Sequence, residues 1–113
     1  MRTLLFFDNV DASVTQISSE FTPDCGQDIS FLIQAVKTGT DGDPYLYIEE
    51  SVDGTVWSPM TNPETCEGFF KLTDTVTGIK DNHFMGYVMR LRLEPNDNTT
   101  GTVWAKMNYR TKL

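Results

Sequence analysis

Residues 45–57 read YLYIEESVDGTVW, two runs of alternating side chains joined at Asp53-Gly54. Alternation with a period of two places every second side chain on the same face of a strand. Asp-Gly between two such runs favours a type I′ turn, because that turn needs positive φ and glycine adopts it without a steric cost. The stretch therefore predicts a β-hairpin, and with it an antiparallel β protein.

Two further alternating runs follow later in the chain. Residues 87–94 read YVMRLRLE, residues 102–109 read TVWAKMNY, and the polar turn between them contains Gly101. We expect these runs to form a second hairpin that pairs with the first. The core-facing side chains would then be Tyr87, Met89, Leu91 and Leu93 on one strand and Val103, Ala105, Met107 and Tyr109 on the other. Arg90, Arg92, Trp104 and Lys106 would share the outer face of one sheet.

The remaining strands are expected at residues 4–10, 13–21, 29–37 and 68–72, whereas residues 73–83 are polar and rich in turn formers. Within 29–37, Leu32 and Val36 place apolar groups on the face opposite Ile33, which indicates a central or interfacial strand. No stretch has helical periodicity. The pattern predicts a single all-β domain over residues 1–113, a two-sheet antiparallel sandwich of seven or eight strands, Ig-like or jelly-roll-like.

The charge of the chain bears on its partners. The net charge is −7, which argues against a nucleic-acid partner because phosphate binding needs clustered Lys and Arg. Residues 1–79 carry three basic and thirteen acidic side chains, whereas residues 80–113 carry six basic and three acidic ones. If strands from both halves mix in the sheets, the basic residues would form a strip on an otherwise acidic surface. Such a strip would be either an ordinary solvated strand face or a docking surface. The apolar run at residues 4–7 is too short for a signal peptide, and we expect no membrane partner.

Few residues suggest chemistry. Cys25 and Cys66 match no zinc spacing, and we expect both to be free and partly buried, with a disulfide as the alternative. His83 is expected to be a loop residue, because no nucleophile motif accompanies it. A calcium site is a further alternative, although its four carboxylates lack the register of a calcium loop. Those carboxylates belong to Asp41, Asp43, Glu49 and Glu50. The sequence predicts no enzyme, no cofactor and no metal.

The aromatic side chains leave two readings open. Trp104 either stacks on Arg90 or Arg92 as a cation–π pair or belongs to an interface, where Trp and Arg are enriched. Trp57, Tyr45 and Tyr47 are the candidates for stacking on a sugar ring.

The motifs also carry a resemblance to a known group. The S-x-D-G-x-x-W hairpin (residues 51–57), the R-L-R-L strand (residues 90–93) and the T-G-T-V strand (residues 100–103) resemble segments of the small β-sandwich proteins of tailed-phage particles, over roughly residues 28–109. The resemblance implies a virion structural protein assembled in the host cytoplasm. Within that group we expect a head decoration (auxiliary capsid) protein that binds and stabilises the capsid lattice without chemistry.

The partner would be the major capsid protein or another virion protein, and association with further copies of itself stays open. The expected contact residues are Trp104, Arg90, Arg92, Lys106, Leu32 and Val36. The apolar segment 1–10 is a further candidate, because a terminal strand can complete a neighbour's sheet. The chain lacks the long arm that some decoration proteins use, so tail, neck and fibre-associated roles stay open. The competing class is a carbohydrate-binding adhesion module, since discoidin-like sandwiches share the hairpin and the arginine-rich strand.

Overall fold

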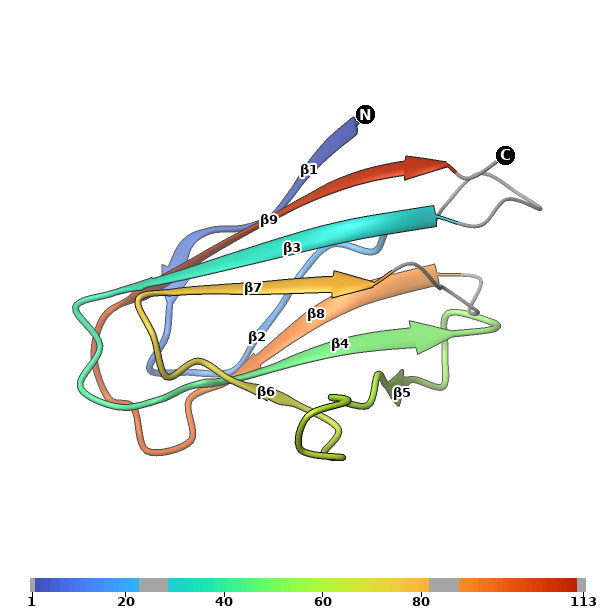
Figure 1. Cartoon of the computed structure of the whole chain (residues 1–113). Coiled ribbons are helices and arrows are strands. Elements are labelled where there is room, and N and C mark those ends of the chain that lie inside the picture. Colours follow the sequence, from blue (N-terminus) through green and yellow to red (C-terminus); the bar gives the residue numbers. More distant parts are fainter. Residues whose placement is uncertain (1, 23–28, 82–87, 112–113) are drawn as a thin grey trace.

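The computed structural model describes residues 2–22, 29–81 and 88–111, and in these ranges it contains nine β-strands and no helix. The strands form two antiparallel sheets that lie face to face (Figure 1). The four-stranded sheet has the order β1 (Arg2–Asp11), β9 (Thr102–Thr111), β3 (Ile29–Thr38), β7 (Val76–Asp81). The five-stranded sheet has the order β2 (Gln16–Ile17), β8 (Val88–Glu94), β4 (Tyr45–Ser51), β5 (Ser58–Pro59), with β6 (Phe70–Lys71) also paired to β4. The prediction of an all-β, two-sheet antiparallel sandwich is confirmed.

Alternate side chains of both sheets fill the core between them. The inward positions of β8, β9 and β3 are buried as their periodicity predicts, while Tyr109 is partly buried against the core. These positions are Met89, Leu91 and Leu93 on β8, Val103, Ala105 and Met107 on β9, and Phe31, Ile33 and Ala35 on β3. Tyr87 lies outside the described residues. β3 is a central strand, between β9 and β7, as expected.

The first hairpin exists, but its turn is longer than predicted. β4 pairs with β5, where Glu50 lies opposite Ser58, so residues 52–57 form the loop. Gly54 has φ +78°, but Asp53 does not have the positive φ that a type I′ turn requires. Instead the Asp53 carboxylate accepts hydrogen bonds from the backbone N–H groups of Thr55 and Val56 at 2.8 and 3.1 Å. These local bonds shape a wider loop and carry the return strand beyond Trp57.

The second predicted hairpin is wrong. β8 pairs with β4 and β2, whereas β9 pairs with β1 and β3 in the other sheet. The connection, residues 95–101, crosses from one sheet to the other and is held by Asn98, which is 2% exposed. The Asn98 amide donates to the Ala12 carbonyl and accepts from the N–H groups of Asp41 and Gly42. Period-two patterning assigns a face to each side chain but does not select the partner strand.

Two other expectations need correction. The polar segment 73–83 contains β7, because an edge strand needs few buried apolar side chains and Ile79 supplies one. The strand expected at 13–21 is reduced to β2 and an isolated bridge between Phe21 and Met89.

Candidate functional site

The expected contact residues lie on the two opposite outer faces of the sandwich. Since β8 and β9 belong to different sheets, Arg90 and Arg92 point away from Trp104 and Lys106. Trp104 therefore stacks on neither arginine, and its cationic neighbour is Lys106, with Nζ 5.8 Å from the ring centroid. We name the two surfaces the Trp104 face, on the four-stranded sheet, and the arginine face, on the five-stranded sheet.

The Trp104 face contains an apolar row that crosses three adjacent strands. Val36 on β3 lies opposite Trp104 on β9 and Val76 on β7. Trp104 and Val36 are half-buried, and Val76 is 53% exposed. On β1, Leu5 lies opposite Lys106 and is 45% exposed. The face is an apolar strip across the four-stranded sheet. Val76 is a member that the sequence did not reveal, and Leu5 belongs to the segment 1–10 that was a further candidate.

A shallow depression lies next to this row. Its volume is about 230 Å³. Leu32, Gln34, Trp104, Lys106 and Asn108 line it. The structure thus brings together four of the six expected contact residues: Leu32, Val36, Trp104 and Lys106.

Charge on the Trp104 face is of one sign along β3, β7 and β9. The charged residues at the outward positions of these strands are Lys80, Lys106 and Arg110, all of them exposed. The part of this face formed by β3, β7 and β9 is therefore a basic area on a protein of net charge −7, whereas β1 places the exposed Asp11 opposite Thr102 at its end. The predicted basic strip therefore exists here, but without Arg90 and Arg92, which lie on the opposite face.

The arginine face is a layer of internal contacts. Glu49, 5% exposed, accepts a hydrogen bond from Arg90 Nε at 2.9 Å and one from Arg92 Nε at 3.3 Å. Arg92 Nη1 also donates a hydrogen bond to Glu94 Oε1 at 2.6 Å. Burial alone would lower the pKa of Arg92, but the bonds and charges of Glu94 and Glu49 outweigh it and hold that pKa above its ordinary value.

The three sugar-stacking candidates also lie on the arginine face. The Arg90 guanidinium lies 4.0 Å from the ring centroid of Trp57, and that of Arg92 lies 3.9 Å from the ring centroid of Tyr47. Tyr45 stacks on Phe69 with the centroids 4.1 Å apart. Each ring therefore has one flat face covered by a side chain of the protein itself.

The carboxylates considered for calcium have partners of another kind. Asp41 accepts hydrogen bonds from the Thr99 hydroxyl and N–H, which lower the pKa of Asp41. A hydrogen bond from Lys37 to Asp43, 2.8 Å long, lowers the pKa of Asp43. Within residues 2–22, 29–81 and 88–111, no three His, Cys, Asp or Glu side chains are placed to hold a metal ion.

The remaining candidates lie in loops or outside the description. Cys66 is free and exposed, which corrects the expectation of partial burial. Cys25 and His83 lie outside the described residues.

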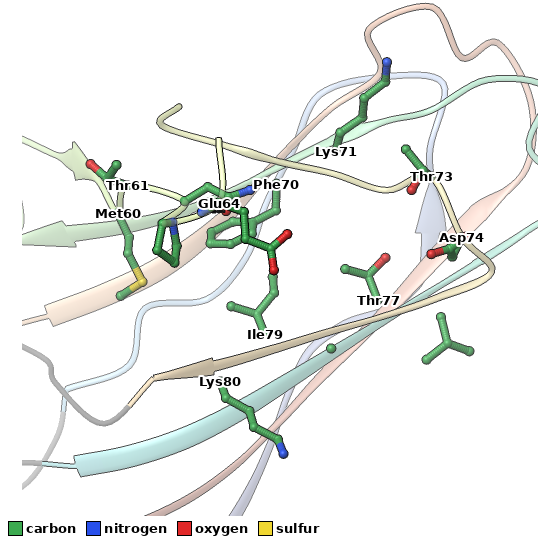
Figure 2. Close-up of a pocket in the computed structure, with 14 residues that line it drawn as sticks. Met60, Thr61, Glu64, Phe70, Lys71, Thr73, Asp74, Thr77, Ile79 and Lys80 are labelled. Carbon is green, nitrogen blue, oxygen red and sulfur yellow. Dashed lines mark hydrogen bonds between the residues drawn. The ribbon is translucent and has the colours of Figure 1, made fainter. Parts of the chain in front are cut away.

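A groove that the sequence did not indicate lies between the two sheets, at the edge formed by β7. Its volume is about 400 Å³, and Figure 2 shows Phe70 and Ile79 in it, with Glu64 beside them. β7 supplies one wall, and β6 with residues 60–64 supplies the other.

No protein-family model matches the sequence, and no curated protein matches it. None of the segments that the structure describes forms a helix able to cross a membrane.

Proposed function

We propose that this chain is a non-enzymatic structural protein of a tailed-phage particle that docks onto the major capsid protein through the Trp104 face, as a head decoration protein. The observation that carries the proposal is the apolar row of Trp104, Val36 and Val76 within a basic surface. Sequence resemblance to the small sandwich proteins of phage particles supports the assignment to a virion.

The Trp104 face has the composition of a protein interface. Tryptophan at the centre of an interface contributes strongly because its large surface loses water on binding, while charged residues at the rim orient the partner. Lys80, Lys106 and Arg110 favour an acidic partner surface. Binding through this face should weaken as salt concentration rises, since exposed charges are screened.

The test is cosedimentation of the purified protein with phage heads that lack it. Trp104→Ala is expected to cost about 2 kcal/mol of binding free energy, about a thirtyfold loss of affinity. Because Trp104 is half-buried on an outer face, the melting temperature of the Trp104→Ala variant should stay close to that of the wild type.

Val76→Ala and Val52→Ala form a matched pair for the same assay. Both valines are exposed, but Val52 lies in the loop after β4, away from the Trp104 face. Val76→Ala should weaken binding and Val52→Ala should leave it unchanged. Equal binding by wild type and Trp104→Ala would reject this face as the docking surface.

A further inference from the structure

A second interaction site lies at the free edge of β7. We propose that this edge, together with the groove beside it, binds an extended peptide segment carrying a Lys or Arg side chain, by addition of a strand to the four-stranded sheet. This site shares β7 with the Trp104 face, but it uses the backbone edge of that strand and the groove between the sheets rather than the outward side chains.

The backbone of β7 presents hydrogen-bonding groups outward. Lys37 N–H donates to the Thr75 carbonyl at 2.9 Å, and the ladder continues in register from Val36 opposite Val76. In an antiparallel pair, hydrogen-bonded and non-hydrogen-bonded residues alternate, so Val76, Gly78 and Lys80 direct their N–H and C=O groups away from β3. Within the described chain, no backbone hydrogen bond occupies these groups.

The other sheet edges in the described ranges are shorter or irregular. β1 has register shifts after Leu5 and after Phe7, which interrupt its edge. β2, β5 and β6 have two residues each, and β5 includes Pro59, which has no N–H to donate. Proteins protect edge strands with such devices, because a long regular edge pairs readily with another strand. β7 has six residues in an unbroken register and no proline, and its Lys80 side chain lies on the outer face of the sheet.

The groove next to β7 selects the side chains of the incoming strand. Phe70 and Ile79, both largely buried, supply its apolar surface, with Met60 beside them. Figure 2 shows the Glu64 carboxylate directed into the groove.

Two carboxylates and two lysines line the groove, and they differ in where their charged groups point. Asp74 lies at the end of the groove near Thr73 and Thr77 (Figure 2). The ammonium groups of Lys71 and Lys80 point away from it. Neither Glu64 nor Asp74 takes part in a salt bridge within the described chain. Both carboxylates are therefore available to a cationic side chain.

These features together define the ligand. A strand paired with β7 places alternate side chains on the groove side, about 7 Å apart. One of them would pack against Ile79 and Phe70, and a neighbour two positions away would reach the carboxylates. The ligand is thus an extended segment with an aliphatic residue and a Lys or Arg two positions apart.

Gly78 offers a direct test of backbone pairing. Its N–H points away from β3, so Gly78→Pro removes an outward donor while keeping every bond to β3. A Cβ at this position meets only Leu32 Cδ1, at 3.8 Å, an ordinary contact, so Gly78→Ala is the matched control.

The experiment measures fluorescence anisotropy of short labelled peptides with alternating Val and Thr residues and a central Arg or Glu. The wild type and Gly78→Ala should bind the Arg peptide, whereas Gly78→Pro should bind it at least about tenfold more weakly. The double variant Glu64→Gln, Asp74→Asn should bind the Arg and Glu peptides equally. This variant tests the charge preference of the groove even if Gly78→Pro fails to fold.

Three results would overturn the proposal. The first is equal binding of the peptide by Gly78→Pro and Gly78→Ala, and the second is equal binding of the Arg and Glu peptides by the wild type. The third is a wild-type protein that forms dimers while the Gly78→Pro variant is monomeric, which would assign the edge to a second copy of the chain. The Trp104→Ala variant should bind the peptide like the wild type while losing affinity for phage heads. The peptide assay therefore tests the β7 edge, and the cosedimentation assay tests the Trp104 face.

Discussion

Glu49→Ala tests whether the arginine face is a structural layer. Glu49 lies on β4 directly opposite Arg90, and its two oxygens hold Arg90 and Arg92 at 2.9 and 3.3 Å. Removing one partner of a buried ion pair costs about 3–5 kcal/mol, because the remaining charge is left uncompensated. The arginine side chains are 19% and 27% exposed, and Arg92 keeps Glu94, so solvent and that bond reduce the loss. We expect about 2–3 kcal/mol.

Urea unfolding and thermal unfolding followed by tryptophan fluorescence measure this loss. For a domain of this size it corresponds to a fall in melting temperature of about 8–15 °C. Glu49→Gln keeps the shape of the side chain and one acceptor oxygen, so its loss should be intermediate. Docking through the Trp104 face should be unaffected at temperatures where the variant is folded, because that face lies on the other sheet.

A small effect would refute this reasoning. If Glu49→Ala costs less than about 0.5 kcal/mol, the ion pairs behave as ordinary surface pairs. The arginine face would then be free to serve a partner, and the case for the Trp104 face as the docking surface would weaken.

Three further predictions concern stability. Leu91→Ala should cost about 2–5 kcal/mol in urea unfolding, because Leu91 is fully buried between the sheets and the change leaves a cavity; a loss below about 1 kcal/mol would contradict that burial. Gly101→Ala should prevent stable folding, as judged by circular dichroism, because φ is +85° and a Cβ would collide with the backbone of Thr38 and Gly39; a melting temperature equal to that of the wild type would contradict the crossing loop. Hydrogen bonds from Thr99 lower the pKa of Asp41 below its ordinary 3.8, so the folded state favours the carboxylate, and its stabilising contribution is present above pH 3.8 and lost as pH falls through the lowered pKa. Asp41→Asn should therefore flatten the acid dependence of unfolding below about pH 4, and an unchanged pH profile would exclude this contribution.

The sequence predicted the faces of the strands well and their partners poorly. The inward sets of β8 and β9 follow from alternation, since burial acts on each strand separately. Their assignment to different sheets depends on the crossing at residues 95–101, which Asn98 fixes by long-range hydrogen bonds. β7 escaped prediction because its burial rests largely on Ile79, a single side chain in a polar segment.

The candidate site was predicted in part for the same reason. Alternation put Trp104 on an outer face, and the two-sided pattern of β3 added Val36 to the candidate residues. Val76 was missed, and Leu5 was expected only as part of segment 1–10, because their places next to these residues depend on strand order. The groove beside β7 depends on how the two sheets meet at one edge, which a local pattern does not contain.

The central proposal is that the protein belongs to the head of a tailed-phage particle. Immunogold labelling of phage particles from the source of the chain, with antibody to the protein and the label scored by position, tests it most directly. The proposed function predicts gold spread over the surface of the head. Label confined to the tail or neck would reject decoration, and unlabelled particles would contradict a place in the virion altogether.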